Sequence, residues 1–364
     1  MRVGLDATPL LGPRTGVGTY TAELIRALVD IAPKADFRAT AFTARGTAPL
    51  ADALPPRVRI HTRHIPARVL RAAWLRVPCP PAEALVGRID VFHGTNFVSP
   101  PTRRASSVVT VHDLSYLRFR ETVATATLAY TQLVPRAISR GAHVCTPSRS
   151  VAHEVLDTYR IGAERVHPTP LGVDPVWFDA AEADGAHAPG GPPYVLAVGT
   201  LEPRKNLTTL IEAYRLAAAR RIALPRLLLV GAQGWGARLD TTGLDPDQVV
   251  RAGHLPFDEL RRTVARASAL VFPSTYEGFG LPPLEALACG IPVLAADLPV
   301  TREVLGEQAR FVEATSPEAL LEGLQRTLAD PAGTAASRRA HAREFTWRAC
   351  AEATLAAYRQ ARQG

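Results

Sequence analysis

Lysine is scarce in this chain: of its 42 basic residues, only Lys34 and Lys205 are lysines, and the rest are arginines. The arginines occur together with abundant alanine and proline, a composition that indicates the codon bias of a GC-rich genome. The formal charge of +8 therefore does not identify an anionic partner by itself. Because no zinc-finger, basic-zipper or aromatic RNA-binding pattern is present, we predict no nucleic-acid partner and keep nucleic-acid binding only as an alternative explanation of the charge.

Cysteine is also scarce, and long apolar runs are absent. The four cysteines are scattered without paired spacing, which is typical of reduced thiols and not of a disulfide framework or a zinc site. No apolar run approaches the roughly 20 residues that span a bilayer, and the chain begins directly in a strand pattern. We therefore expect a cytoplasmic protein that needs no metal or other cofactor.

The pattern that remains is typical of an α/β fold. With 364 residues and 47% hydrophobic content, the chain is long enough for two cores. Short apolar runs alternate with amphipathic stretches, as in parallel sheets wound with helices. The runs that predict strands are residues 3–7, 37–43, 58–62, 91–93, 107–111 and 143–146, and then 194–198, 227–230, 249–252, 269–272, 293–295 and 311–312.

The strand pattern restarts after residues 182–193, which are rich in alanine, glycine and proline and predict a linker. We therefore predict two Rossmann-like domains that face a cleft, an N-terminal domain of residues 1–175 and a C-terminal domain of residues 190–345. Residues 346–364 predict an amphipathic helix, capped by Thr346, that returns to the first domain.

The most informative segment is residues 276–285, Tyr-Glu-Gly-Phe-Gly-Leu-Pro-Pro-Leu-Glu. It lies between a predicted strand and a predicted helix, so Glu277 is expected at the carboxyl end of the strand and Glu285 in the first helical turn. Gly278 and Gly280 allow the backbone to approach a ligand closely. Two carboxylates at one pocket suit a polyhydroxylated ligand, although a lone capped helix with an acid in its first turn would have a similar pattern. The whole segment favours a sugar-nucleotide site.

Three further turns follow predicted strands. Thr15-Gly-Val-Gly-Thr-Tyr20 precedes a helix predicted at 21–29, and it lacks the third glycine of the dinucleotide fingerprint, so it is either a pyrophosphate or acceptor loop or a plain tight turn. His112 and Asp113 follow the strand at 107–111, where a functional role competes with a structural one. Arg204 and Lys205 precede a helix predicted at 207–216, where they could clamp a diphosphate or form a solvated basic turn.

Taken together, these residues resemble family 4 of the glycosyltransferases, which are retaining enzymes of the GT-B architecture. The resemblance covers nearly the whole chain. Within the family, the motifs are most similar to those of bacterial mannosyltransferase-type members. It is carried by residues 15–20, 93–97, 111–114, 146–148, 171–174, 199–206, 254–260 and 276–292.

The resemblance implies roles for individual residues. Glu277 would hold the donor sugar, Glu285 the ribose, and His112 the transferred sugar. The implied donor contacts further include Gly16 and Gly18, the diphosphate ligands Arg204 and Lys205, and the backbone of Gly278, Phe279, Gly280 and Leu281. Asn96 and Asp113 are the candidates for acceptor binding, in the N-terminal domain. One departure is Thr200 after Gly199, where many relatives carry arginine, and Arg204 is the candidate replacement.

The same resemblance implies a mechanism and a donor. A leaving diphosphate is stabilised by fixed cations and helix N-termini, so no metal is needed. Asp245 and Asp247 have the spacing of the Asp-x-Asp metal motif, but they are expected to form an N-cap or a turn. The implied reaction retains anomeric configuration, with the departing phosphate as base. GDP-mannose is the first expectation for the donor, ahead of UDP-linked glucose or N-acetylglucosamine. The acceptor is a glycan, a lipid-linked glycan or a small molecule.

Two other readings of the chain stay open. A non-catalytic nucleotide-sugar-binding protein would keep the second-domain pattern without an acceptor site. Residues 68–76, read as a helix, spread Arg, Val, Leu and Trp around the axis, so either peripheral contact with an anionic membrane or packing against the sheet could explain them.

Overall fold

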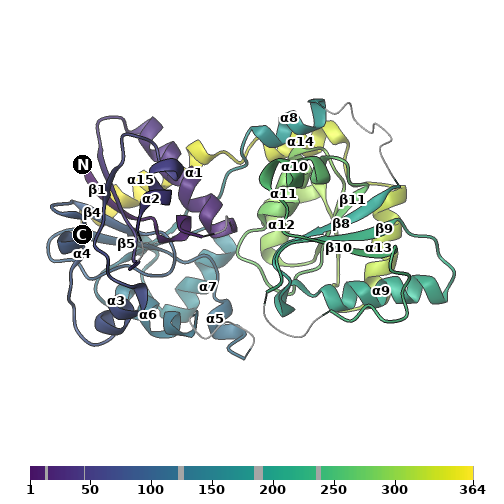
Figure 1. The fold of residues 1–364 in the computed structure, drawn as a ribbon, viewed down its shortest axis with the longest axis horizontal. Helices are drawn as coiled ribbons and strands as arrows, with labels where there is room; N and C mark the ends of the chain where they lie inside the picture. The colour runs from purple at the N-terminus through teal and green to yellow at the C-terminus, as the bar shows by residue number, and fades with distance from the viewer. Residues whose placement is uncertain (13–14, 45, 122–126, 184–191, 235–238, 364) are drawn as a thin grey trace. The chain divides into compact units, whose positions relative to one another are not determined.

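A computed structural model of the protein describes residues 1–12, 15–44, 46–121, 127–183, 192–234 and 239–363. The chain divides into two compact units (Figure 1). Unit 1 comprises residues 1–172 and 346–364, and unit 2 comprises residues 173–345. The division falls at Gly172, before the predicted linker at 182–193, part of which lies outside the described residues.

The sheet of unit 1 has seven parallel strands among the described residues, in the order β3-β2-β1-β4-β5-β6-β7. The fully buried side chains of Val3 and Leu5 lie on β1, an interior strand of this sheet. Its strands are β1 (Arg2–Asp6), β2 (Asp36–Thr40), β3 (Arg59–His61), β4 (Val91–Gly94), β5 (Ser106–Thr110), β6 (His143–Thr146) and β7 (Val166–Pro168).

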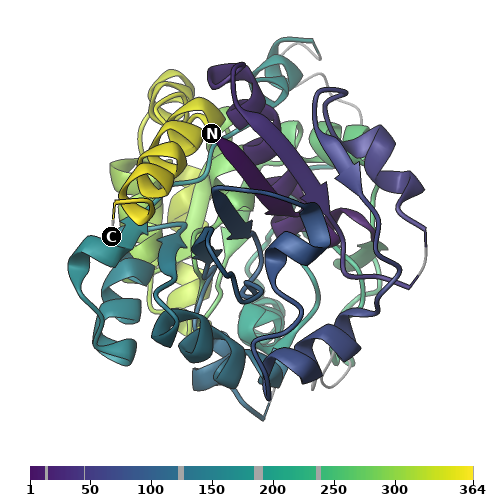
Figure 2. The same ribbon diagram turned by 90° about the vertical axis from the view of Figure 1, so that its left-hand side faces the viewer.

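Helices cover this sheet, and the last of them comes from the end of the chain. Helix α15 begins after Thr346, whose hydroxyl accepts a hydrogen bond from the Ala349 N–H, and it packs against α1 (Figures 1 and 2). Trp347 and Tyr358 bury their rings in unit 1. The helices are α1 (Gly16–Ile31), α2 (Ala48–Ala53), α3 (Ala67–Trp74), α4 (Ala82–Val86), α5 (Ser115–Arg118), α6 (Tyr130–Ser139), α7 (Arg149–Tyr159) and α15 (Trp347–Ala361), with 3-10 turns η1 (Thr8–Leu10), η2 (Thr127–Ala129) and η3 (Ala163–Arg165).

Unit 2 repeats the plan with a six-stranded parallel sheet in its described part, in the order β10-β9-β8-β11-β12-β13. Its strands are β8 (Tyr194–Val198), β9 (Arg226–Val230), β10 (Val249–Gly253), β11 (Ala269–Phe272), β12 (Val293–Ala296) and β13 (Arg310–Val312). Its helices are α8 (Val176–Ala183), α9 (Leu207–Ala219), α10 (Phe257–Ala265), α11 (Leu281–Ala288), α12 (Pro299–Leu305), α13 (Pro317–Ala329) and α14 (Ala335–Ala342), with 3-10 turns η4 (Pro203–Lys205) and η5 (Gly306–Gln308).

The structure differs from the sequence prediction at helix α1 and at strand β7. Helix α1 begins at Gly16 and not at residue 21, because the Thr15 hydroxyl caps it by accepting from the Gly18 N–H at 3.4 Å. Strand β7 was not predicted at all; it is a three-residue edge strand, Val-His-Pro, too short to show alternation.

Candidate active site

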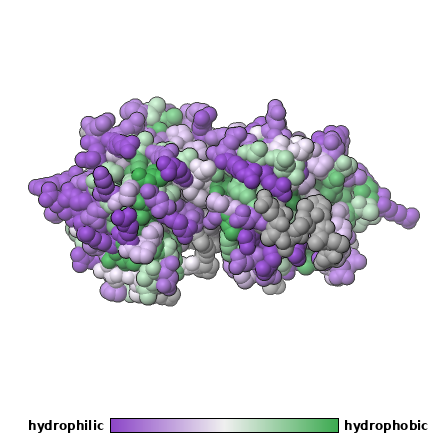
Figure 3. Space-filling view, turned by 90° about the horizontal axis from the view of Figure 1, so that it is seen from above, coloured by the Kyte–Doolittle hydropathy of each residue, from purple (hydrophilic) through white to green (hydrophobic). Residues whose placement is uncertain are grey.

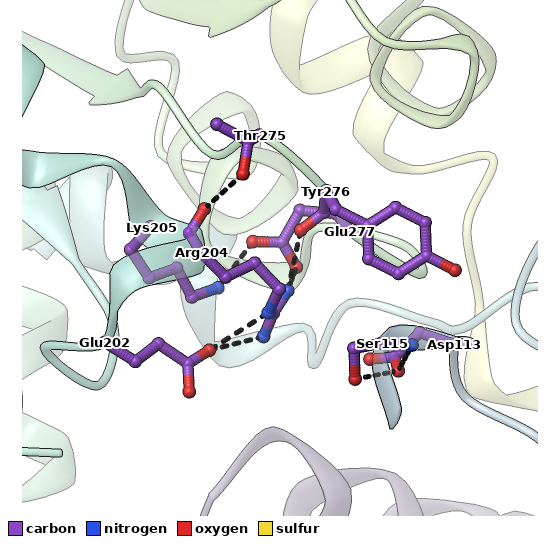
Figure 4. A network of polar contacts seen from close by, with 8 residues as sticks. All are labelled: Asp113, Ser115, Glu202, Arg204, Lys205, Thr275, Tyr276 and Glu277. Carbon is purple, nitrogen blue, oxygen red and sulfur yellow. Dashed lines mark hydrogen bonds and ion pairs between the residues drawn. The ribbon is translucent and has the colours of Figure 1, made fainter. Parts of the chain in front are cut away.

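The strongest polar network in unit 2 joins the turn after β8 to the segment after β11 (Figure 4). Glu277 accepts from Lys205 Nζ at 2.5 Å through Oε1 and from Arg204 Nη1 at 2.7 Å through Oε2. The sequence placed these three residues in one site, and the structure brings their side chains into direct contact. Both cations are therefore paired with this carboxylate.

The ion pairs set the ionisation of Glu277. Burial alone would raise the pKa of this carboxyl, but the charges of Arg204 and Lys205 outweigh burial and lower the pKa to about 2. Glu277 is thus a carboxylate at any physiological pH, which suits hydrogen bonds from sugar hydroxyls and does not suit a proton donor.

Glu202 is a member of this network that the sequence did not predict. Its Oε1 accepts from Arg204 Nε at 3.1 Å and from Nη2 at 2.7 Å, while Arg204 Nη1 also donates to the Tyr276 carbonyl oxygen at 2.8 Å. The guanidinium is held between two carboxylates, one on each edge. The only sequence signal was the spacing of an acid two residues before an arginine in a proline turn.

The turn that carries these cations is fixed by Asn206. This residue has a left-handed backbone, φ 53°, and its side-chain amide donates to the carbonyl oxygens of Pro273 at 3.1 Å and Ala314 at 2.7 Å. The Thr275 N–H also donates to the Arg204 carbonyl oxygen, at 2.9 Å. The turn after β8 is therefore tied to the ends of β11 and β13, which keeps Lys205 close to Glu277.

Glu285 lies apart from this network and has the opposite electrostatics. It is the fifth residue of α11, so it lies in the second turn and not in the predicted first turn, because the helix already begins at Leu281. Burial, together with the negative charge of Asp174, raises the pKa of Glu285 to about 8. A carboxyl with this pKa is mainly protonated at neutral pH.

The backbone between the two acids has the conformation that the glycines predicted. Gly280 is the N-cap of α11 and has φ +102°, a backbone conformation that residues other than glycine rarely adopt. Gly278 and Phe279 are buried, and Leu281 starts the helix. The Phe279 ring packs edge-on against Phe345, with centroids 6.0 Å apart.

In unit 1, the two glycines of the predicted loop lie in the first turn of α1. Gly16 is exposed and Gly18 is buried, and a side-chain Cβ at Gly16 would meet no atom within 4 Å. The packing of the described residues therefore leaves room for a side chain at Gly16.

His112 lies two residues beyond the end of β5 and is held from three sides. Its Nε2 lies 2.9 Å from the Thr95 carbonyl oxygen, and because a carbonyl can only accept, Nε2 carries a proton. Tyr20 and Phe97 pack against the ring edge-to-face, at 4.9 Å and 5.5 Å between centroids. Burial lowers the pKa of His112, so the neutral ring has its acceptor lone pair on Nδ1.

The two acceptor candidates lie in loops that follow strands of unit 1. Asp113 Oδ1 accepts from the Ser115 N–H at 2.9 Å and from its hydroxyl at 2.6 Å, so it organises the start of α5. Asn96 is half-buried after β4, and its carbonyl oxygen accepts from the Val98 N–H at 2.7 Å. The contacts of Asp113 are those of a turn former.

The other polar and apolar features are weaker candidates. Asp245 Oδ1 accepts a hydrogen bond from the Asp247 N–H at 2.9 Å, as in a turn. The described residues hold no group of three or more metal-ligating side chains.

Helix α3 buries Leu70 and Trp74 in the core and exposes Val69. Hydrophilic and apolar residues are interspersed on the face in Figure 3, and none of the described helices has the length and apolar content to cross a membrane.

Comparisons with known proteins match both halves of the chain. The family described as Glycosyltransferase Family 4 matches residues 14–177, and the family described as Glycosyl transferases group 1 matches residues 180–345. The O-antigen chain mannosyltransferase B of Escherichia coli is 26% identical over 99% of this chain and 100% of its own length. The MMP alpha-(1->4)-mannosyltransferase of Mycolicibacterium hassiacum is 28% identical over 64% of this chain and 57% of its own length.

Solved structures show the same fold. Sucrose-phosphate synthase from Thermosynechococcus elongatus superposes with a TM-score of 0.72 at 22% identity, covering 99% of this chain and 98% of its own. HepE of Anabaena, solved with UDP-glucose, superposes with a TM-score of 0.70 at 18% identity, covering 98% of this chain and 99% of its own. With its two parallel-sheet units and the family matches along both, the chain belongs to glycosyltransferase family 4 and is a glycosyltransferase of the GT-B fold.

Proposed function

We propose that the protein is a retaining mannosyltransferase that uses GDP-mannose and acts on a glycan, a lipid-linked glycan or a small molecule. The names of its relatives from E. coli and M. hassiacum support mannose as the sugar. The observation that supports transfer from a sugar nucleotide is the pairing of Lys205 and Arg204 with Glu277, because it places two cations suited to a diphosphate beside a carboxylate suited to sugar hydroxyls.

In the proposed donor complex, Lys205 and Arg204 hold the diphosphate and Glu277 holds the sugar. The four charged side chains of Glu202, Arg204, Lys205 and Glu277 sum to zero, so a bound diphosphate must compete with Glu277 for the ammonium of Lys205. Lys205 has three donors and can turn from a carboxylate to a phosphate without leaving its place. The fixed guanidinium of Arg204, held by Glu202, keeps Glu277 aligned during this exchange.

The chemistry follows from these contacts. As the bond between the anomeric carbon and the phosphate oxygen breaks, negative charge grows on the diphosphate, and the ammonium of Lys205 stabilises it. Glu277 stays ionised and orients the sugar through its hydroxyls. The acceptor hydroxyl attacks the same face of the sugar, and its proton passes to the departing phosphate. No metal takes part in these steps.

The remaining contacts are proposed from the motifs. Glu285 binds the ribose, and the backbone of Gly278 to Leu281 contacts the donor sugar. Gly16 and Gly18 approach the diphosphate, and His112 accepts a hydrogen bond from the transferred sugar at Nδ1. Asn96 and Asp113 contact the acceptor. We also propose a cytoplasmic location, with peripheral contact to an anionic membrane.

The second candidate function is nucleotide-sugar binding without transfer, and one experiment separates the two. A thermal-shift panel of nucleotides and sugar nucleotides identifies the base and sugar, because a ligand at 100 times its Kd stabilises the protein by about 2.7 kcal/mol. Acceptor-dependent consumption of the donor so identified then establishes transfer. Binding of GDP-mannose without consumption in the presence of any acceptor class would favour the non-catalytic protein, and stabilisation by UDP-sugars alone would refute the proposed donor.

A further inference from the structure

A chain of buried hydrogen bonds crosses unit 1 beneath His112. Tyr358 OH lies 2.7 Å from His93 Nδ1, His93 Nε2 lies 2.7 Å from Thr110 Oγ1, and Thr110 Oγ1 lies 2.8 Å from Tyr20 OH. All four side chains are at most 1% exposed. These bonds link α15, at residues 347–361, through β4 and β5 to α1, at residues 16–31.

Each of these hydrogen bonds needs one donor and one acceptor, so the role of each side chain depends on the roles of its neighbours. Burial lowers the pKa of His93 to about 3, so its ring is neutral, with one nitrogen donating and the other accepting. The hydroxyl groups of Tyr358 and Thr110 can each donate or accept. The tautomer of His93 therefore decides which of these two hydroxyls donates to the ring and which accepts from it. Loss of one hydroxyl therefore leaves a buried nitrogen or oxygen unpaired further along.

The chain ends at a ring that touches His112. Tyr20 packs edge-to-face against the imidazole, with an interplanar angle of 85°, and Thr110 is two residues before His112 in the sequence. Tyr20 is also two residues after Gly18 in α1. One side chain thus joins the start of α1 to the histidine loop.

We propose that Tyr20 is a positioning residue for His112, and that the C-terminal helix α15 fixes Tyr20 through the buried chain of Tyr358, His93 and Thr110. The proposal rests on the proposed function only for the role of His112 as a contact of the transferred sugar. Its structural part, that α15 controls the environment of the His112 ring, is independent of any activity.

The test uses the full chain with three substitutions that each remove one hydroxyl: Tyr20→Phe, Tyr358→Phe and Thr110→Val. The matched control for the tyrosines is Tyr214→Phe, since Tyr214 is equally buried and donates to the Pro225 carbonyl oxygen at 3.1 Å within unit 2. Thr110→Ser is the rescue variant, because it keeps the hydroxyl in the middle of the chain.

The first readout is the ¹⁵N spectrum of protein labelled at histidine, with the His112 signals assigned by His112→Gln. We expect the Nδ1 and Nε2 shifts of His112 to move in all three test variants, including Tyr358→Phe at the far end, and to stay in place in Tyr214→Phe and Thr110→Ser. Unchanged His112 signals in folded Tyr358→Phe would overturn the proposal, whether or not the protein transfers sugar.

The second readout is kinetic. Tyr20→Phe and Tyr358→Phe should lower kcat by between about fivefold and a hundredfold, because a displacement of about 1 Å at a catalytic group has effects of that size. Affinity for the nucleoside diphosphate should not change. The double variant should resemble the worse single one, since both break one chain. Fully additive losses, or a lower Tm with normal kcat, would reduce the chain to a structural role.

Discussion

If Glu285 binds the ribose as proposed, nucleotide binding should release a proton from this carboxyl and strengthen as pH rises. The pKa of this half-buried carboxyl is about 8, because desolvation and the negative charge of Asp174 both disfavour its ionised form. Ribose offers two hydroxyl donors, which bind best to an ionised carboxylate. Binding in this way requires that the carboxyl lose its proton. The observed affinity is therefore reduced by the free energy of ionising Glu285, which depends on pH.

The size of the effect follows from the pKa. If only the ionised form binds, the affinity is proportional to the ionised fraction, which rises about ninefold between pH 6 and 7 and about fivefold between pH 7 and 8, and then levels off. Because phosphate groups themselves titrate near pH 6, the interval from pH 7 to 8 isolates Glu285.

Calorimetric titration with GDP at several pH values, in buffers of different ionisation enthalpy, measures both the affinity and the protons released. Glu285→Gln should bind more weakly at pH 8 and lose the pH dependence. Asp174→Asn, which removes the neighbouring charge, should shift the rise in affinity to lower pH. A wild-type affinity that is flat from pH 7 to 8, or a Glu285→Gln variant with wild-type affinity at pH 8, would refute the ribose assignment.

The same pKa shift has a stability consequence with a definite sign. The folded protein holds this proton up to about pH 8, whereas the unfolded chain loses it near 4.5. The contribution of this one carboxyl to the free energy of unfolding is therefore present in full below pH 4.5 and is lost as pH rises through about 8. Glu285→Gln should flatten that part of the curve of Tm against pH.

Four further outcomes are expected. Lys205→Ala should lower kcat/KM by at least about two orders of magnitude, since loss of one contact to a developing anion costs about 2.7 to 4 kcal/mol; unchanged turnover would remove Lys205 from the site. Glu277→Gln should depress kcat while GDP binds as well as before or better, because it frees Lys205, and a weaker affinity for GDP would contradict the proposed competition. EDTA should leave transfer intact, and restoration of activity by Mn²⁺ after a loss would reopen the roles of Asp245 and Asp247. Flotation with anionic liposomes should recover the protein at low salt, and failure to float would end the membrane proposal based on α3.

The sequence predicted most of this architecture because burial in parallel sheets leaves a local signal. Runs such as residues 194–198 and 269–272 are apolar throughout, and the corresponding strands have those same limits. Edge strand β7 lacked that signal because it is short and ends in proline. Helix α1 was predicted too short because capping by Thr15 allows two glycines to stand inside a helical turn.

The sequence predicted that Glu277, Arg204 and Lys205 lie together, but it did not predict the electrostatics around them. Proximity of Glu277 to Lys205 followed from two turns at the same edge of a sheet. The protonated state of Glu285 depends on Asp174, and the alignment of Arg204 depends on Glu202, and neither pairing has a sequence signature. Contacts such as His93 with Tyr358, 265 residues apart, are invisible until the chain is folded.

The return of α15 to unit 1 sets an order of events during synthesis. A ribosome makes unit 2 before it releases residues 346–364, so the first unit to begin folding is the last that can be completed. Until Tyr358 emerges, His93 has a nitrogen with no buried partner, and the surface of α1 that α15 will cover stays open to water. A nascent chain that stalls or ends early within this last helix therefore presents a finished unit 2 beside an unfinished unit 1, which is the form that chaperones and proteases would recognise.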